Sequence, residues 1–399
     1  MKISVFFDIY CPFHENKDPG QIPLGLMETE INAGVITVTK KDLANYSPKF
    51  LLTQSALKEF YNEEFWLKND SDVIIAYPLQ GVFYSPLIEK MKLGGKKVLL
   101  KFDSDGRIAY PLQRHSRRIP LHERLTARNL VSDIWWHLPF KSLKRKRHTK
   151  VAAETIRQLE LSDWGIIESP DALSNLNFFL AAWGRRDLIK KTYFIPNPVT
   201  PEFVEGEIGK KENIAISYGR WDDFRQKNTW VMVETVMEFL KERRDYRFII
   251  FGAGTEKVKN LIEHIPKNVR ERIIILGFVE REKIKALLTN AKIFFVPSRW
   301  ESFSIASGEA LCMGCSVVGT PLESLRYLSM QGFSGTTGST FDRESILAAL
   351  LQDAIKWENG DYDPEKIALY WRAKLDRKII AKNIETLASK VLNNSIREG

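Results

Sequence analysis

The sequence predicts an α/β protein of two doubly wound, Rossmann-like domains that face each other across a cleft. With 399 residues, the chain is longer than one hydrophobic core ordinarily serves. Short apolar runs alternate with helix-length stretches, a pattern typical of parallel sheets covered on both faces. A proline-rich segment, Tyr193–Phe203, favours an extended connection near the middle of the chain. We therefore expect domains at 1–195 and 196–375, and a C-terminal helix at 376–399 that crosses back to the first domain.

Each expected strand is a short, continuous apolar run. The first one, MKISVFFDIY, is interrupted by Asp8 and has no small-residue cleavage site, so we expect a buried strand rather than a signal peptide. Expected helices include 230–241 and 281–289, and the tail from Asp363 to Leu392 has the apolar spacing of one amphipathic helix. The expected strands are Ile3–Phe7, Val73–Ala76, Lys97–Lys101, Trp164–Ile167, Ile214–Tyr218, Arg247–Phe251, Ile273–Leu276, Ile293–Val296 and Ser316–Gly319.

The composition narrows the class of protein. Apolar residues make up 44% and charged residues 27% of the chain, as in soluble globular proteins. No apolar run approaches the roughly 18–20 residues that span a bilayer. Three cysteines are too few for a disulfide framework, which fits a reducing cytoplasm. The net charge of +9 favours a polyanionic partner: nucleic acid, an anionic membrane surface or phosphorylated substrates.

Two cations follow a predicted strand of the second half. Arg220 comes directly after Gly219, and Lys227 lies just before a predicted helix at 229–240, for which Asn228 is a candidate N-cap. A guanidinium binds phosphate oxygens in pairs and an ammonium acts as a point charge, so the two suit a diphosphate. Solvated surface cations would have the same spacing.

Two further strand-to-helix turns carry glycine. The segment FGAGTEK lacks the third glycine of a dinucleotide fingerprint and the G-K-[ST] of a phosphate-binding loop, so it indicates only a turn. In LGFV, Gly277 and Phe278 could present backbone groups and a ring to a nucleotide base. Phe278 would serve equally well in core packing.

Two glutamates eight positions apart flank a run of small and hydroxylated residues. A helix is expected from about Ser304 to Cys312, and its first amides have no partner within the helix and attract anions. Carboxylates accept hydrogen bonds in pairs, so Glu301 and Glu309 suit vicinal hydroxyls. Both could instead be acids favoured near a helix start, an interpretation that fits Glu309 less well because its neighbours are small or apolar.

The order of these segments resembles the GT-B glycosyltransferases of retaining family 4, the glycosyl transferases group 1. Their E-x7-E motif is present as Glu301-SFSIASG-Glu309, and Arg220 with Lys227 matches their phosphate-binding pair. IPNPV, FGAG, LGFV and CMGCSVVGT also occur in the family's order. The resemblance covers Ile195–Pro321. The family usually has Gly-Phe-Gly where this chain has Ser302-Phe303-Ser304, which bears on the identity of the donor sugar.

The resemblance implies a hexosyltransferase that uses a nucleoside-diphosphate sugar as donor and needs no metal or other cofactor. Glu309 would bind the ribose hydroxyls, and Glu301 would bind the donor sugar near its reacting carbon. The diphosphate would be held by four groups: the side chains of Arg220 and Lys227 and the amides near Phe303 and Ser304.

The first half contains two looser matches to the family. Gly20 lies where the family often has a glycine-bearing loop with two adjacent glycines, and we expect this loop to face the donor. Asp103 lies where the family often has histidine, and we expect it to take part in catalysis by orienting the donor or the acceptor. Asp103-Ser104-Asp105 also matches the D-x-D of metal-dependent transferases, although Asp-Ser-Asp-Gly equally suits a turn, and we expect no metal.

Aromatic residues precede a basic run in the segment from Ser132 to Lys150. Such a segment suits an anionic lipid surface, single-stranded nucleic acid, or a core segment followed by a solvated helix. Given the resemblance, we expect peripheral association with the inner face of the membrane and a lipid-linked or cell-surface glycan acceptor. The residues expected at this surface are Trp135, Trp136, Lys144, Arg145, Lys146 and Arg147.

Other chemistries fit the sequence less well. Cys312 and Cys315 form C-x-x-C in an apolar segment, where small buried side chains are expected rather than a redox pair. The six histidines have no zinc spacing. Two alternatives stay open beside the transferase: a GT-B epimerase or phosphorylase, and a basic nucleic-acid-binding protein, which would leave Glu301 and Glu309 without a role. The sequence predicts no oligomeric state.

Overall fold

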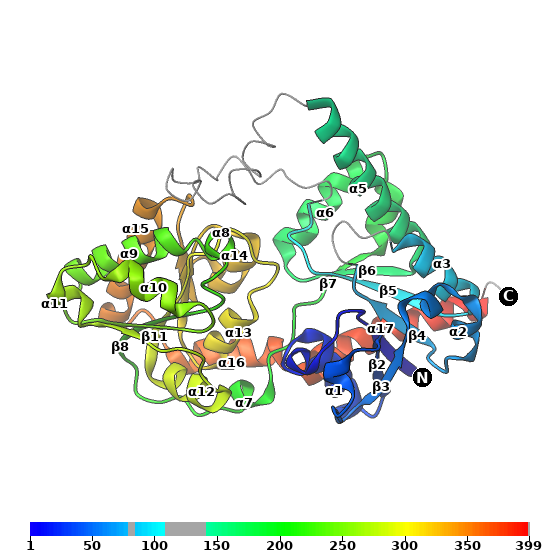
Figure 1. Ribbon diagram of the computed structural model, residues 1–399, viewed down its shortest axis with the longest axis horizontal. Helices are drawn as coiled ribbons and strands as arrows, with labels where there is room; N and C mark the ends of the chain where they lie inside the picture. The colour runs from blue at the N-terminus through cyan, green and yellow to red at the C-terminus, as the bar shows by residue number, and fades with distance from the viewer. Residues whose placement is uncertain (79–83, 108–140, 398–399) are drawn as a thin grey trace.

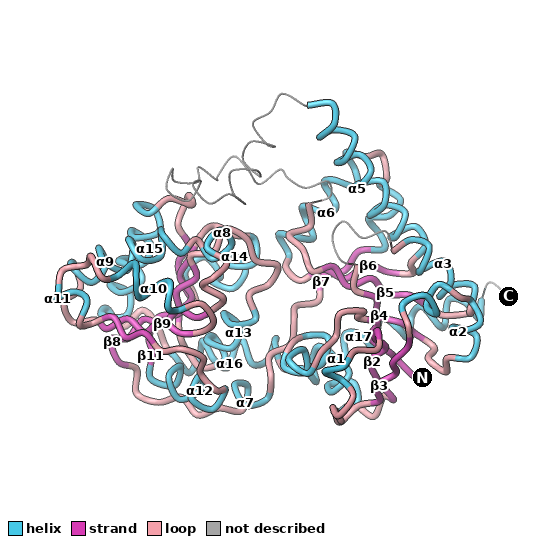
Figure 2. Tube along the Cα trace, in the orientation of Figure 1, coloured by secondary structure: helices cyan, strands magenta, loops and turns pink. Residues whose placement is uncertain are grey.

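The computed structural model describes residues 1–78, 84–107 and 141–397, and of residues 141–148, 331 and 394–397 it describes only the backbone. It consists of two α/β domains side by side, each built on a parallel sheet (Figures 1 and 2). This confirms the predicted fold class. The first sheet ends at Phe194, and the second begins at Glu212.

The first domain contains a seven-stranded sheet in the order β3-β2-β1-β4-β5-β6-β7. All of its neighbouring strands run parallel. The strands are β1 (Lys2–Phe6), β2 (Asn32–Val38), β3 (Leu51–Ser55), β4 (Val73–Ala76), β5 (Lys97–Phe102), β6 (Trp164–Ile167) and β7 (Thr192–Phe194). The helices around this sheet are α1 (Asp18–Glu28), α2 (Glu63–Lys68), α3 (Ser85–Leu93), α5 (Lys141–Leu161) and α6 (Pro170–Ala182), with 3-10 turns such as η1 (Pro12–Asn16).

The second domain contains a six-stranded parallel sheet in the order β10-β9-β8-β11-β12-β13. Its strands are β8 (Glu212–Tyr218), β9 (Arg247–Phe251), β10 (Ile273–Ile275), β11 (Ala291–Val296), β12 (Ser316–Gly319) and β13 (Gly335–Thr337). Its helices are α7 (Pro201–Val204), α8 (Phe224–Lys227), α9 (Thr229–Glu242), α10 (Thr255–Ile262), α11 (Lys267–Arg270), α12 (Arg281–Asn290), α13 (Ile305–Cys312), α14 (Glu323–Ser329), α15 (Arg343–Asn359) and α16 (Pro364–Leu375).

The alternation of side chains along the strands gives the first domain two cores. Ile3 and Val5 of β1 pack into one core, while Phe6 packs into the other on the opposite face of the sheet. In β4, Ile75 and Ile74 divide between the two cores in the same way. A strand buried on both faces is apolar at most of its positions, which explains the continuous runs seen in the sequence.

Four strands of the structure, β2, β3, β7 and β13, were not predicted. Three of them, β3, β7 and β13, lie at the edges of their sheets, and β2 lies next to an edge. Edge strands are covered less completely, so their sequences include polar residues, such as Thr53 and Gln54 in β3 and Thr336 in β13. Continuous apolar runs therefore identify the central strands and the apolar edge strand β10, and miss the other three edge strands.

The C-terminal segment crosses between the domains, as Figure 1 shows for α16 and α17 (Arg377–Arg397), drawn in orange and red. Ile380 and Ile384 of α17 lie in a core of the first domain, which confirms the predicted return. The prediction of one continuous tail helix is wrong. The helix breaks at Asp376, which has extended ψ, and the Val199 amide of the interdomain linker donates to the carbonyl of Leu375 at 2.8 Å.

Candidate active site

Loops from both domains meet at the carboxyl ends of strands. Asp103 follows β5 of the first sheet, and Ser302 follows β11 of the second. The two loops influence each other electrostatically: burial and the charge of Asp18 raise the pKa of Asp103, hydrogen bonding to the Ser302 side chain of the second domain lowers it, and the charge of Glu301 raises it. Parallel sheets place ligand sites at the carboxyl ends of their strands, so this junction is the candidate active site.

Lys227 and Glu301 form an ion pair in this region. The Lys227 ammonium lies 2.5 Å from Glu301 Oε1, and the Ser298 hydroxyl donates to the same oxygen at 2.7 Å. Both side chains are mostly buried, with 16% and 14% exposed. The aliphatic part of Lys227 lies over Gly219, where a Cβ would be 3.3 Å from Lys227 Cε. The small residue before Arg220 thus lets the lysine reach Glu301.

Arg220 lies beside this pair and keeps an exposed side chain. Its guanidinium donates to the Gln226 side chain at 3.3 Å. Because Arg220 follows Gly219 and Lys227 lies over that glycine, the structure brings the two predicted phosphate cations together. Because this is a weak bond to a neutral group, and Arg220 makes no ion pair with another described residue, the exposed guanidinium is available to an anion.

Asn228 is the N-cap residue of α9, but it does not cap the helix in the predicted way. The residue adopts a left-handed conformation (φ 52°), because α8 ends and α9 begins at this one position. Its side chain is fully buried and makes no hydrogen bond within the described part of the chain. The prediction of a side-chain cap at Asn228 is therefore wrong.

The helix predicted after Glu301 is α13, and its predicted bounds are confirmed. Its N-cap, Ser304, has a φ of 68°, in the left-handed region that favours glycine, so the serine occupies a position suited to the family's usual residue. The Phe303 ring is fully buried in the core of the second domain. Only the backbone of Phe303, and not its side chain, is thus available to a ligand.

Glu309 lies in α13 with 4% exposed. One carboxylate oxygen accepts from the hydroxyl of Tyr218, and the other accepts from the Arg281 guanidinium at 3.1 Å. Neither partner was anticipated from the sequence. Tyr218 ends β8 and Arg281 begins α12, and only the folding of the sheet brings these positions to α13.

The two glycine-containing turns lie next to each other. The Gly252 amide donates to the Gly277 carbonyl at 3.0 Å. A side chain on Gly277 would meet no atom within 4 Å, so this backbone faces open space. The neighbouring Phe278 is 79% exposed, so it is not a core residue. An exposed ring beside an open backbone is compatible with the predicted contact to a base.

A buried polar cluster near Asp103 was not found from the sequence. The Lys101 ammonium is fully buried and contacts Glu168 Oε1 at 2.8 Å and Asn197 Oδ1 at 2.5 Å. Asp18 lies 3.8 Å from the same ammonium. These residues come from four separate segments, each apolar or turn-like in sequence, so no local spacing could have revealed the cluster.

The electrostatics of this cluster follow from burial. Asp103 retains contact with solvent. The surrounding protein nevertheless desolvates it and, together with the charge of Asp18, raises the pKa of Asp103. Burial also raises the pKa of Glu168, to about 8. The site therefore keeps a carboxyl group at the domain junction with a reduced tendency to ionise.

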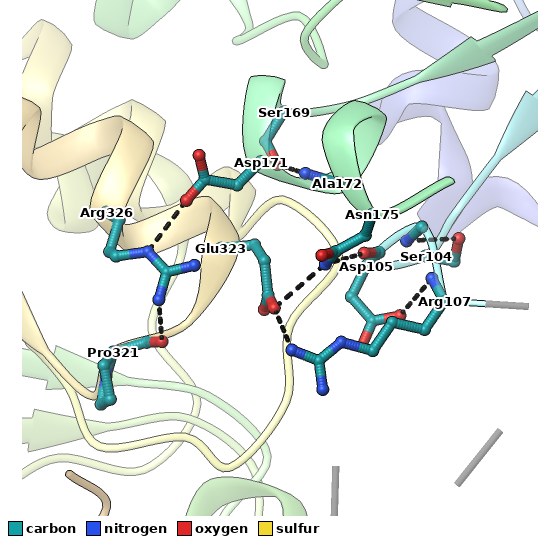
Figure 3. Close-up of polar contacts among 11 residues, drawn as sticks. Ser104, Asp105, Arg107, Ser169, Asp171, Ala172, Asn175, Pro321, Glu323 and Arg326 are labelled. Carbon is teal, nitrogen blue, oxygen red and sulfur yellow. Dashed lines mark hydrogen bonds and ion pairs between the residues drawn. The ribbon is translucent and has the colours of Figure 1, made fainter. Parts of the chain in front are cut away.

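A second set of polar contacts joins the domains beside the site (Figure 3). Glu323 of α14 accepts from the Arg107 guanidinium at 2.7 Å and from the Asn175 amide of α6 at 3.2 Å. Arg326 of α14 pairs with Asp171 of α6 at 2.8 Å. Helices α14 and α6 thus connect the two domains through charged side chains.

Two other segments of the first domain that were predicted to have functional roles form a helix start and a turn. Gly20 lies in the first turn of α1 rather than in a loop, and a Cβ there would be 2.4 Å from the Cα of Glu15. Its lack of a side chain allows η1 and α1 to approach closely, and its role at a donor stays a prediction. In the D-x-D segment, Ser104 accepts from the Gly106 amide and Asp105 from the Arg107 amide, as in a turn. Among the described residues, no group of three or more acidic, histidine or cysteine side chains is arranged to hold a metal.

The predicted membrane surface lies largely outside the described residues. Trp135 and Trp136 are not described, and Lys144, Arg145, Lys146 and Arg147 are described only as backbone of α5. No described helix has both the length and the apolar character needed to cross a bilayer. Cys312 and Cys315 are buried and free, as expected.

Comparisons with known proteins agree with this architecture. Residues 212–356 match the family model of glycosyl transferases group 1. An uncharacterized glycosyltransferase of Bacillus subtilis, YqgM, is 29% identical over 157 residues, which are 38% of this chain and 43% of that protein. The chain therefore matches less than half the length of this curated relative.

Solved structures resemble the whole chain in fold. The lipopolysaccharide outer core galactosyltransferase WaaB has a TM-score of 0.66 at 15% identity, over 98% of this chain and 99% of that one. Anabaena Alr3699/HepE in complex with UDP has a TM-score of 0.64 at 14% identity, over 98% of this chain and 100% of that one. The chain thus has the GT-B architecture, and residues 212–356 within its second domain match the model of the glycosyl transferases group 1 family.

Proposed function

We propose that this protein is a retaining glycosyltransferase that moves a hexose from a nucleoside-diphosphate sugar to an acceptor hydroxyl. The observation that carries the proposal is the meeting of Lys227, Glu301 and Asp103 at the junction of two Rossmann-like domains. The match of residues 212–356 to glycosyl transferases group 1 supports it.

In this proposal the second domain binds the donor. Arg220 and Lys227 hold the diphosphate together with the amides of Phe303 and Ser304 at the start of α13. Gly277 and Phe278 contact the base, and Glu309 accepts hydrogen bonds from the ribose. The neighbour solved with bound UDP has the same architecture, which is compatible with a nucleotide in this domain.

The chemistry requires stabilisation of a departing diphosphate. Cleavage of the bond between the sugar and the diphosphate leaves positive charge on the sugar and additional negative charge on the leaving group. Prepositioned cations and amides stabilise that charge, typically by roughly 3–4 kcal/mol for each donor. Glu301 binds the sugar close to the positive charge, and its ion pair with Lys227 fixes the carboxylate.

Retention follows if the acceptor attacks from the face that the diphosphate leaves. The departing phosphate then takes the proton of the acceptor hydroxyl, so the reaction requires no dedicated base and, in this proposal, no metal. Asp103 reaches the same region from the first domain. Its carboxyl group orients the acceptor or the donor sugar by hydrogen bonding.

We further propose that the acceptor is lipid-linked or part of a cell-surface glycan, and that the protein works in the cytoplasm at the inner face of the membrane. The basic and aromatic segment around 135–147 supports this because cations near anionic lipid contribute about 1 kcal/mol each. The fold neighbour named as a lipopolysaccharide galactosyltransferase is compatible with such an acceptor. Flotation with liposomes tests this part, and equal partitioning with neutral and anionic vesicles would contradict it.

The donor is tested by thermal shift with UDP-, GDP-, ADP- and dTDP-sugars. A ligand at about 100 times its Kd stabilises the native state by roughly 2.7 kcal/mol. We expect one nucleotide class to raise Tm and to be turned over to the free nucleoside diphosphate in the presence of acceptor. Absence of a shift with every nucleotide sugar would refute the proposal.

Product analysis separates the transferase from its alternatives. A GT-B epimerase would change the donor sugar without an acceptor, and a phosphorylase would need inorganic phosphate. A nucleic-acid-binding protein would bind oligonucleotides with strong dependence on salt and would not respond to nucleotide sugars.

A further inference from the structure

Glu309 is held on both carboxylate oxygens by side chains from two other elements. Tyr218, at the end of β8, donates its hydroxyl to one oxygen. Arg281, at the start of α12, donates to the other at 3.1 Å. The carboxylate is nearly buried, so these two contacts fix its orientation.

Tyr218 is itself fixed in place. Its ring stacks on Phe251 with centroids 4.7 Å apart and an interplanar angle of 13°, and its edge meets Phe294. Burial and the adjacent Glu309 charge raise the pKa of Tyr218 well above its ordinary value. The phenol therefore stays protonated and acts as the hydrogen-bond donor of the pair.

Arg281 joins Glu309 to the start of the second domain. Its guanidinium also donates to Glu202 at 2.5 Å and to the Thr200 hydroxyl at 2.5 Å, and it lies over the Phe203 ring at 5.0 Å. Thr200 and Glu202 follow the interdomain linker directly. The planar guanidinium thus has several fixed partners and little freedom to turn away from Glu309.

Within the described part of the chain, the hydrogen-bonding capacity of Glu309 is only half used. An ionised carboxylate offers about four lone-pair sites, two on each oxygen. Tyr218 and Arg281 occupy one site on each oxygen, which leaves one acceptor site on each. Two acceptor sites on one rigid carboxylate match two vicinal hydroxyls.

We propose that Tyr218 and Arg281 are positioning residues that orient Glu309, so that each of its oxygens accepts one of the two ribose hydroxyls of the donor. This inference rests on the proposed function, because it needs a nucleotide at α13. Two residues outside the E-x7-E motif would thus make the site selective for a ribose that carries both hydroxyls.

Calorimetric titration tests this with Tyr218→Phe. The probes are UDP, GDP and ADP, each paired with its 2′,3′-dideoxy counterpart. For the nucleotide that the wild-type protein binds, we expect Tyr218→Phe to raise the Kd about tenfold, the effect of one lost hydrogen bond to a charged group. The Kd of the dideoxy counterpart should be the same for both proteins, because it does not use Glu309.

The comparison between the two ligands separates positioning from a general structural role. A loss of equal size for the ribose and the dideoxy nucleotide would overturn the inference. Tyr370→Phe is the matched control. Tyr370 lies on α16, and its ring packs against Phe333 and Trp371. This substitution should leave both Kd values unchanged. If the wild-type protein bound none of the six probes, the proposed function itself would be refuted.

Arg281 is tested by a second pair of variants. Arg281→Gln removes the charged partner of Glu309, whereas Glu202→Gln weakens only the contact of Arg281 with α7. We expect Arg281→Gln to lose about tenfold in affinity for the ribose nucleotide alone, and Glu202→Gln to keep the wild-type preference for ribose. The assignment would be contradicted if Glu202→Gln lost the preference for the ribose nucleotide over its dideoxy counterpart while Arg281→Gln kept it.

Discussion

At the scale of single residues, the candidate site combines paired charges with groups left available to a ligand. Lys227 neutralises Glu301, while the neighbouring Arg220 is exposed and hydrogen-bonds a neutral side chain, with no ion pair to another described residue. In the proposed function, such a site binds the diphosphate without a large rearrangement. Two predictions concern single side chains near the junction.

Replacing Lys227 by methionine should lower turnover by about 100- to 1,000-fold, because one preorganised donor to the leaving diphosphate is lost. Release of nucleoside diphosphate in the presence of acceptor measures this. Lys241→Met is the matched control, because Lys241 pairs with Glu238 on the surface of α9. Similar turnover in the two variants would contradict a role for Lys227 at the diphosphate.

At about pH 9, above the pKa of about 8 that burial gives Glu168, replacing Lys101 by methionine should lower the free energy of unfolding by about 3–5 kcal/mol, because the ionised Glu168 is left as a buried charge without its cation. Chemical denaturation measures the loss. Adding Glu168→Gln removes that charge while keeping an acceptor for Asn197, so the double variant should be more stable than Lys101→Met alone. A double variant that is no more stable would show that the pair is not coupled.

At the scale of elements, helices fix the site through contacts that the sequence alone does not display. Helix α17 covers a face of the first sheet, and α15 closes the edge of the second sheet at β12 and β13. Each helix makes a prediction that can be tested without substrate.

Ile384→Ala in α17 should cost about 2–5 kcal/mol of stability, since its side chain is fully buried in the first domain. Ile379→Ala removes the same atoms from the same helix, two positions after its start. The Ile379 side chain is 38% exposed, so this substitution should lower the free energy of unfolding much less. Urea denaturation of the two variants measures the difference. Equal losses would mean that α17 does not pack on the first domain as described.

Asp353 of α15 gives the protein a pH dependence. Burial raises its pKa to about 6, against the lowering effect of hydrogen bonds from Ser316, Tyr362 and Thr336. An acid with a raised folded pKa stabilises the native state at low pH and loses that contribution as pH rises through the folded pKa. Relative to Asp353→Asn, the wild-type protein should therefore lose about 2 kcal/mol between pH 4 and 7, measured by denaturation at each pH. A constant difference would refute the assignment.

At the scale of the whole molecule, the site exists only where the domains meet. Glu323 receives hydrogen bonds from Arg107 and Asn175, and Arg326 pairs with Asp171. These contacts hold α14 against the first domain. They connect domain arrangement with the proposed reaction.

Glu323→Ala should loosen this arrangement and lower turnover about tenfold, which corresponds to about 1.4 kcal/mol. The affinity for the donor nucleotide should change little, because the proposed donor groups lie in the second domain. Small-angle scattering should report a larger radius of gyration than in the wild type. Glu344→Ala, an exposed acid on α15, is the control, and an equal effect of both variants would contradict the coupling.

The sequence by itself determined the class of fold and much of the proposed donor site. Central strands buried on both faces are apolar at most of their positions, so β4, β6, β9 and β12 were predicted with their observed bounds. The helix after Glu301 was also predictable, because small residues follow the end of the preceding strand. The proximity of the two cations Arg220 and Lys227 was predictable because both come shortly after the end of one strand.

The tertiary structure alone decided which distant residues meet. Tyr218 and Arg281 at Glu309, and Lys101 with Glu168 and Asn197, come from separate elements whose local sequences give no indication of a partner. The edge strands and the break at Asp376 likewise depend on neighbours rather than on periodicity. The physical reason is that hydrophobic periodicity is a local property of the chain, whereas hydrogen bonds and ion pairs between elements form only after the sheets have brought the strand ends together.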